Sequence, residues 1–170
     1  MSKWRSVLKS VVVLPVLSTL FTQSNYASER FDYQRVQLTQ AGVDADVIQV
    51  KKLSDLQLFL NDPSQQPLLK FENIKKQLHY CERLEFAMNA GMYHPDYAPV
   101  GLYIENRKQL TGLNEQQGFG NFFLQPNGVV AWNDQQAVIE TTQDFKTSRF
   151  KANYATQSGP MLIIDGKINP

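Results

Sequence analysis

The chain has 170 residues, a formal net charge of +1 and 42% hydrophobic residues. A nearly neutral chain lacks the basic field that drives non-specific binding to nucleic acid, so the sequence predicts no nucleic-acid partner. Its single cysteine, Cys81, cannot form an internal disulfide, and its cysteine and histidine residues do not occur at the spacing of zinc ligands. We therefore expect no metal site and no cofactor, and a fold that depends on packing for its stability.

The first 27 residues have the layout of a secretory signal peptide. Three basic residues precede an apolar run over 11–17, and small residues follow near Ala27. The run is too short to span a bilayer comfortably, so we expect no stable membrane span after cleavage; the alternative is an uncleaved N-terminal anchor. The roughly 140 residues that remain suffice for one domain. The prediction is a signal peptide over 1–27 and a single globular unit over 28–170, in the periplasm or secreted.

Alternating and helical patterns follow in the first half of this domain. Between Phe31 and Leu60, apolar residues alternate with polar ones, which predicts strands separated by turns near Gly42 and Asp55. From Phe71 to Cys81, apolar residues recur at three- and four-residue spacing. This spacing predicts an amphipathic helix that covers the sheet, with the cysteine on its buried side.

A run of mostly apolar residues from Leu84 then ends at Asn89, and the small residues Ala90 and Gly91 follow it. The pattern predicts a buried strand that gives way to a loop, which is how a rigid scaffold presents a functional site. The polar residues expected on this loop are Asn89, Tyr93, His94 and Asp96. His94 and Asp96 are the adjacent titratable pair there, and either take part in proton transfer or are simply exposed.

Further strand signals continue to the end of the chain. Gly101, inside a predicted strand from Val100 to Glu105, indicates either the close approach of another backbone or a ligand, or a bulge. Asn127 and Gly128 lie between apolar runs and predict a hairpin turn with a mainly structural role. Other predicted strands are Ala137–Glu140, Tyr154–Ser158 and Met161–Ile164, and turns are expected at Asn106–Lys108 and Asp165–Gly166. The predicted fold class is α+β, a mostly antiparallel sheet with one or more helices packed on it.

Five ordered motifs resemble the phosphodiester glycosidase family. They are Asn89–Tyr93, Pro99–Leu102, Gly120–Phe123, Pro126–Val129 and Gln157–Leu162. This family includes N-acetylglucosamine-1-phosphodiester alpha-N-acetylglucosaminidase and bacterial envelope homologues. The resemblance covers roughly Phe31 to the C-terminus and implies a sugar phosphodiester or an envelope glycan as the partner. Relatives continue well past the last motif, so we expect the chain to be incomplete at its C-terminus.

The motifs also give candidate site residues. A phosphate monoester has a second pKa of about 6 and leaves readily as an anion, so neutral hydrogen-bonding groups matter more here than a strong general acid. The predicted substrate-binding residues are Asn89, Tyr93, Asn121, Gln157 and Ser158. The predicted site-shaping residues are Gly91, Gly101, Gly159 and Pro160. No spacing singles out the pair of carboxylates that most glycosidases use, so the catalytic residues stay unassigned.

Two functions of different class remain open. The first is an exported hydrolase that cleaves sugar-1-phosphodiester bonds. The second is a non-catalytic remnant or a carbohydrate-binding envelope protein.

The four consecutive apolar residues Met161–Ile164 are typical of a strand covered on both faces. Because little sequence follows them, we expect an exposed apolar edge that promotes association.

Overall fold

The structure is a computed structural model that describes residues 25–38 and 42–169. These residues form two compact units: 25–28 with 32–38 and 42–49, and 29–31 with 50–169. The predicted signal peptide lies outside the described residues except for its last three. Within the described ranges, no helix combines the length and the apolar character needed to cross a membrane.

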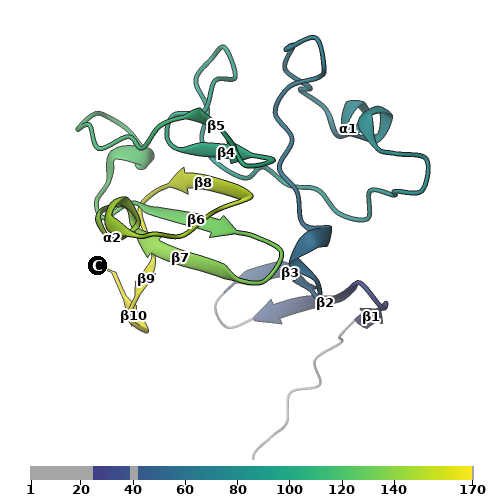
Figure 1. The fold of residues 1–170 in the computed structure, drawn as a ribbon. Coiled ribbons are helices and arrows are strands. Elements are labelled where there is room, and N and C mark those ends of the chain that lie inside the picture. Colours follow the sequence, from purple (N-terminus) through teal and green to yellow (C-terminus); the bar gives the residue numbers. More distant parts are fainter. Residues whose placement is uncertain (1–24, 39–41, 170) are drawn as a thin grey trace, which may run out of the picture. The chain divides into compact units, whose positions relative to one another are not determined.

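The first unit is a three-stranded sheet in the order β1-β2-β3 (Figure 1). Its strands are β1 (Asn25–Ala27), β2 (Phe31–Leu38) and β3 (Val43–Val50). β1 runs antiparallel to β2, with Ala27 opposite Asp32. The alternating pattern therefore predicts β2 and β3 correctly. The strand expected after Asp55 does not form, since residues 56–60 pair with no other strand, and β1 was not predicted because its residues fall in the expected signal peptide.

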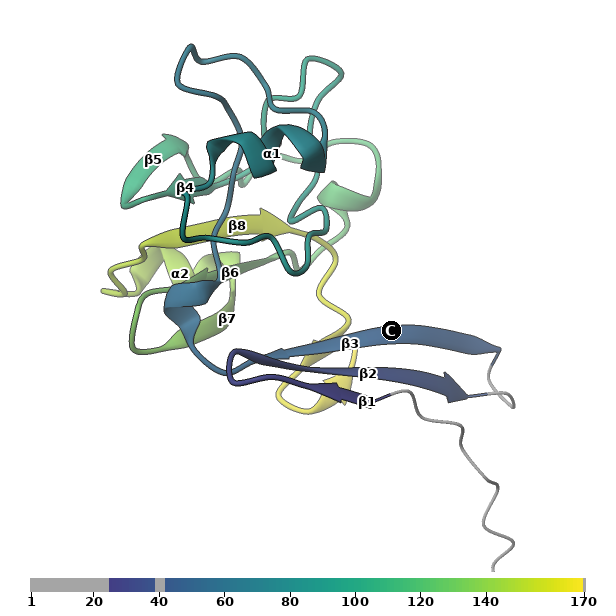
Figure 2. The same ribbon diagram turned by 90° about the vertical axis from the view of Figure 1, so that its right-hand side faces the viewer.

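The second unit is built on a five-stranded sheet in the order β5-β4-β8-β6-β7 (Figures 1 and 2). Its strands are β4 (Tyr103–Glu105), β5 (Lys108–Thr111), β6 (Gly128–Trp132), β7 (Ala137–Thr141) and β8 (Tyr154–Ser158). Every pair of neighbours in this sheet is antiparallel. The predicted α+β class and the predicted strands near 137–140 and 154–158 are confirmed.

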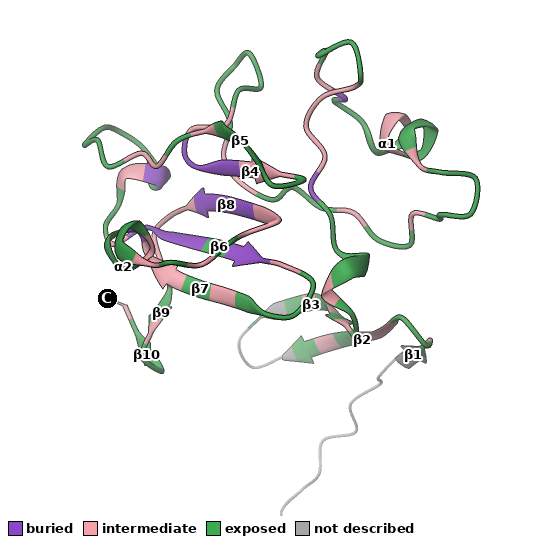
Figure 3. Cartoon of the chain, viewed as in Figure 1, coloured by how far each residue is buried: buried purple, intermediate pink, exposed green. Residues whose placement is uncertain are grey.

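The two faces of this sheet are covered by different parts of the chain, and Figure 3 shows its central strands as the most buried. On one face, Leu102, Val129, Ala131 and Ala155 form a core against which Phe145 of helix α2 (Thr142–Thr147) packs. Thr141 caps the N-terminus of this helix, since its hydroxyl accepts the N–H of Asp144 at 3.2 Å.

The opposite face is covered by a stretch that has little regular structure. Tyr103 and Trp132 form a second core cluster with Leu58, and Leu53 and Leu60 pack against it. Residues 53–55 form a short helix, η2 (Leu53–Asp55), and the following residues are extended without a strand partner. The indole N–H of Trp132 donates to the carbonyl of Leu56 at 2.9 Å, so the covering stretch is fastened to the sheet.

Three further predictions before β4 are wrong. Residues 84–89 form no strand, because much of the run faces solvent; Phe86 is 44% and Met88 68% exposed. The predicted helix shortens to α1 (Phe71–Gln77), and it cannot cover the sheet because none of its residues is buried. Cys81 is exposed and not buried, since it lies beyond the end of that helix. Figure 2 shows α1 within the long connection between β3 and β4.

The predicted turn at Asn127 and Gly128 is also wrong, because Gly128 is the first residue of β6 and Asn127 is buried. The hairpins lie elsewhere. Asn106 and Arg107, with φ values of 50° and 66°, form the two-residue turn between β4 and β5. Asp165 and Gly166 likewise join β9 (Ile163–Ile164) to β10 (Lys167–Ile168).

The β9–β10 hairpin does expose apolar side chains, as the sequence predicts. Leu162 is 73% exposed, Ile163 61% and Ile168 84%. The strand itself is shorter than predicted, since it contains Ile163 and Ile164 alone. A strand covered on both faces is therefore not formed here.

Candidate functional site

The C-terminal end of β8 is the place where the motifs meet. A Cβ atom at Gly91 would lie 2.6 Å from Thr156 Oγ1, and one at Gly101 would lie 2.6 Å from Gln157 Oε1. A Cβ atom at Gly159 would lie 2.6 Å from that of Asn127. These distances are shorter than real contacts, so each glycine is required by close packing. At Gly101 the structure shows a close approach and not a bulge. The approaching groups are the side chains of Gln157 and Phe122, not a backbone or a ligand.

Gln157 joins several segments at this point. Its side-chain oxygen accepts the N–H groups of Leu102 at 3.0 Å and Asn114 at 2.9 Å. Its side-chain nitrogen donates to the carbonyl of Asn114 at 2.8 Å and to Thr142 Oγ1 at 3.0 Å. An amide side chain has two donor and two acceptor positions, and all four are used. The side chain is 2% exposed, so the structure places Gln157 beneath the site and not on its surface.

The same network continues to Asn127 through Thr142. The Thr142 hydroxyl donates to Asn127 Oδ1 at 2.7 Å while it accepts from Gln157. Asn127 in turn donates from Nδ2 to the carbonyl of Phe122 at 3.3 Å. Phe122 lies in η3 (Asn121–Phe123). One chain of buried hydrogen bonds therefore ties together four of the five motifs, and Gly91 brings the remaining one against Thr156.

Other predicted site residues lie at the surface of the protein. Asn89 and Asn121 are exposed, and Ser158 and Pro160 are partly exposed. Among the described residues, none forms a hydrogen bond with the side chain of Asn89, Asn121 or Ser158. These amide and hydroxyl groups are thus free to bind sugar hydroxyls or phosphate oxygens. Gly91 and Gly101 bring the segments that carry such groups onto β8.

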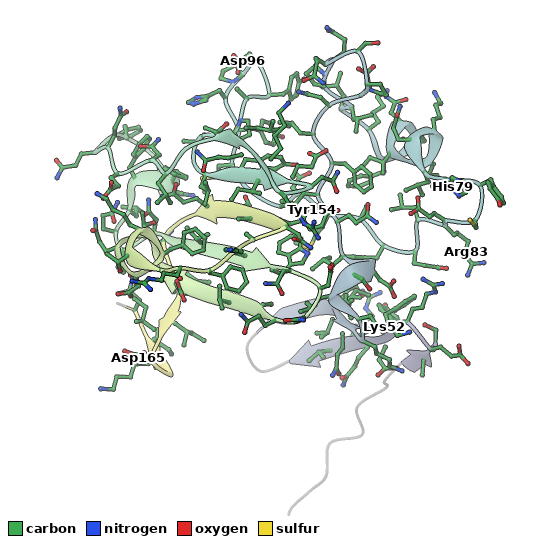
Figure 4. All side chains as sticks on the ribbon, in the orientation of Figure 1. Lys52, His79, Arg83, Asp96, Tyr154 and Asp165 are labelled. Carbon is green, nitrogen blue, oxygen red and sulfur yellow. The ribbon has the colours of Figure 1, made fainter. Side chains whose placement is uncertain are left out.

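Tyr93 lies in a small hairpin that leaves the sheet between Gly91 and Gly101. Tyr93 pairs with Pro99, and the N–H of Val100 donates to the carbonyl of Met92 at 3.1 Å. Figure 4 shows Asp96 on this loop, pointing away from the sheet. Its carboxylate accepts the N–H of Ala98 at 3.1 Å, so it stabilises the turn. His94 is exposed, and its N–H donates to the carbonyl of Ala98 at 2.8 Å.

A partly buried carboxyl group lies on β4, two residues beyond Tyr103. Glu105 Oε2 accepts the Tyr103 hydroxyl and the N–H of Leu60, each at 3.1 Å. Burial raises the pKa of Glu105, and the two donors oppose this rise. Burial likewise raises the pKa of Tyr103 and of Tyr154, the latter labelled in Figure 4. Glu105 fastens the covering stretch at Leu60 to the sheet.

Nowhere in the described part of the chain do three or more His, Cys, Asp or Glu side chains gather as a metal site would need. The exposed carboxylate Glu115 instead accepts hydrogen bonds from Lys146 and Gln143, and these bonds lower its pKa.

Sequence reasoning missed the roles of Asn114, Thr142 and Thr156. Each is polar and each contacts a motif residue, but none lies within a motif. Asn114 and Thr142 are separated from Gln157 by 43 and 15 residues. No local pattern marks such partners, because the fold alone brings them together.

Comparison with known proteins identifies relatives of the C-terminal half. A model of the phosphodiester glycosidase family matches residues 82–170. The uncharacterized protein YigE of Escherichia coli (strain K12) is 47% identical over 88 residues, which cover 52% of this chain and 34% of YigE. The match thus spans about a third of that relative's length. No solved structure gives a significant match.

Proposed function

Since the chain belongs to the phosphodiester glycosidase family, we propose that it binds a sugar-1-phosphodiester at the C-terminal end of β8 and hydrolyses the bond between the sugar and the phosphate. The substrate is a sugar phosphodiester of the cell envelope. The polypeptide acts after export, in the periplasm or outside the cell.

The observation that carries this proposal is the buried network at the end of β8. Gln157, Thr142 and Asn127 connect four motifs that are far apart in the sequence. A network whose members are all satisfied is rigid, and it is costly to disrupt. A rigid network of this kind can hold binding groups in a preorganised arrangement, as a hydrolytic site requires.

The exposed groups suit the chemistry of this reaction. The amides of Asn89 and Asn121 can donate to phosphate oxygens and accept from sugar hydroxyls, and the Ser158 hydroxyl can do both. Water attacks the anomeric carbon, and the bond from that carbon to the phosphate oxygen breaks. The electron pair stays on the phosphate monoester, and the proton from water goes to solvent. Since the monoester is a stable anion, neutral donors that hold it favour its departure.

Hydrolysis is tested by incubating the purified chain with UDP-N-acetylglucosamine and with a synthetic methyl phosphodiester of N-acetylglucosamine 1-phosphate. The proposal predicts release of free N-acetylglucosamine, measured by chromatography, together with one UDP or one methyl phosphate for each sugar. Absence of release from both substrates by a folded protein would exclude the hydrolase.

Export has its own test, which is motivated by the basic start and the apolar run over 11–17. Mass spectrometry of protein recovered from the periplasm should show a new N-terminus within a few residues of Ser28. Recovery of the intact chain from the cytoplasm, with Met1 still present, would contradict export.

A carbohydrate-binding protein without catalysis is the second candidate. The free side chains of Asn89, Asn121 and Ser158 are neutral, and neutral groups bind sugars without supplying a proton. This candidate predicts binding of N-acetylglucosamine 1-phosphate without turnover of the diester. The same incubation therefore separates the two functions when binding is measured beside it.

A further inference from the structure

The hairpin between Gly91 and Gly101 carries two tyrosine rings side by side. The centroids of Tyr93 and Tyr97 lie 5.8 Å apart, and the ring planes are inclined by 28°. The rings are stacked, yet they are not buried, because Tyr93 is 52% and Tyr97 45% exposed. About half of each side chain therefore remains open to solvent, although the two rings lie against each other.

The backbone holds Tyr97 in an unusual conformation. Its φ is +67°, in the left-handed region that a bulky side chain rarely adopts. The turn is closed by the N–H of Tyr97 donating to the carbonyl of His94 at 2.8 Å, and Asp96 accepts the N–H of Ala98. Glycine or asparagine would fit this position with less strain. A tyrosine here is not explained by the turn, which points to a use for its ring.

Both ends of the hairpin are fixed to the candidate site. Gly91 packs on Thr156 and Gly101 packs on the Gln157 side chain, which are adjacent residues of β8. The hydrogen bond from Val100 to Met92 closes the base of the hairpin. The paired rings are thus presented by a short, fastened segment and not by a free loop, so little order has to be gained when a ligand binds.

We propose that Tyr93 and Tyr97 form an aromatic platform that binds the pyranose ring of the substrate. One face of a pyranose carries C–H groups, whose partial positive charge suits the negative face of a tyrosine ring. This inference rests on the proposed function, since it assigns the sugar end of the phosphodiester to this hairpin. The amides and the hydroxyl nearer β8 then face the phosphate end.

The decisive variant is Tyr97→Gly, which removes the ring and relieves the backbone strain. Binding of N-acetylglucosamine 1-phosphate, of glucose 1-phosphate and of inorganic phosphate is measured by calorimetry on the full chain. We expect Tyr97→Gly to bind both sugar phosphates about tenfold more weakly, which is the loss expected for one stacked ring. We expect inorganic phosphate, which has no ring, to bind both proteins equally. The variant should unfold at the same temperature as the original chain or higher.

Two controls keep structure and binding apart. Tyr97→Phe keeps the ring and should retain the affinity, whereas Tyr80→Ala removes a tyrosine that is 93% exposed beyond α1 and should change nothing. Equal affinity of Tyr97→Gly and the original chain for both sugar phosphates would overturn the platform, as would failure of the original chain to bind either. Binding and turnover are measured separately. If Tyr97→Gly hydrolyses the diester and binds both sugar phosphates with unchanged affinity, the platform is contradicted and the hydrolase is not. Ring-dependent binding without hydrolysis would contradict the hydrolase alone.

Discussion

The C-terminal end of β8 and the stretch from Leu84 to Ala98 carry similar polar residues in opposite surroundings. At the end of β8, the amide of Gln157 is buried and all four of its hydrogen-bonding positions are filled by the protein. In the other stretch, the amide of Asn89 is exposed and irregular backbone surrounds it. Two residue types with the same chemistry therefore serve different purposes.

This difference separates motif residues that build the site from those that can bind a ligand. A buried amide with no free position cannot contact a substrate without breaking bonds that the fold needs. An exposed amide with free positions contributes little to stability, and it can exchange water for a ligand. The family motifs combine both kinds, which is why the motif alone does not tell which residue touches the substrate.

The largest effect is expected at the buried member of this comparison. Gln157→Ala would leave the buried N–H of Leu102 and the partly buried N–H and carbonyl of Asn114 without partners, at a cost of about 3 kcal/mol in unfolding free energy. Urea unfolding monitored by fluorescence measures the change. Gln135→Ala, at an exposed position, should change stability by less than about 0.5 kcal/mol. Equal effects at the two glutamines would remove the distinction between them.

Asn89, the exposed residue of this comparison, should affect turnover and leave stability nearly unchanged. We expect Asn89→Ala to reduce turnover of the sugar phosphodiester by ~10²-fold, as loss of a preorganised polar group does. Its unfolding free energy should stay within about 0.5 kcal/mol of the original, because the side chain is exposed. Steady-state kinetics and urea unfolding test the two halves of this prediction. An unfolded variant, or one with normal turnover, would make Asn89 a structural residue.

A smaller effect is expected where the hairpin joins β8. Gly101→Ala places a Cβ atom 2.6 Å from Gln157 Oε1 and 2.7 Å from the Phe122 ring, which should destabilise the fold by about 1–3 kcal/mol. Gly112→Ala is the matched control, since its nearest neighbour would be Gln109 Nε2 at 3.7 Å. Thermal melting compares the two. A stable Gly101→Ala protein would show that the packing at Gln157 is loose.

The smallest effect concerns pH and the carboxyl group that fastens Leu60. Burial raises the pKa of Glu105 above its ordinary value of 4.5, so the folded state keeps the proton longer than the unfolded state. The protonated Glu105 therefore contributes its full share of stability below pH 4.5. This share is lost as the pH rises through the pKa of Glu105 in the folded protein. Since the group is partly exposed, the change is on the order of 0.5 kcal/mol.

Glu105→Gln should abolish this pH dependence. The glutamine oxygen can still accept from Leu60 and Tyr103, so the contacts are kept while the titration is lost. Unfolding measured from pH 4 to pH 8 gives the difference between the two proteins. An unchanged pH profile in the variant would show that another group causes the slope.

Local patterns predicted the part of the fold that local chemistry determines. The alternation in Tyr154–Ser158 became the central strand β8, and the turn-forming residues near Asn106 became a two-residue hairpin turn. Strand periodicity and turn preference are properties of a few neighbouring residues, so they are readable in the sequence. The α+β class followed from the same signals.

The remaining errors come from contacts between distant residues. Asn127 and Gly128 form a strong hairpin signal, but Thr142 and Phe122 hold Asn127 in the core and the turn does not form. The run that ends at Asn89 is as apolar as a strand, yet it finds no partner strand. At Asn127 tertiary contacts overrode the local preference, and at 84–89 the pairing that a strand needs is missing. For the same reason, the sequence could suggest Gln157 as a site residue but not show that its amide is already fully bonded.

The most direct test of this division is a nuclear magnetic resonance titration of the full chain with N-acetylglucosamine 1-phosphate. The side-chain amide signals of each asparagine and glutamine are followed separately. We predict that the signals of Asn89 and Asn121 shift as the ligand is added, while those of Gln157 and Asn127 stay in place and exchange slowly with solvent. Larger shifts at Gln157 and Asn127, with Asn89 and Asn121 unaffected, would contradict the account, because the ligand would then contact the groups assigned to the framework.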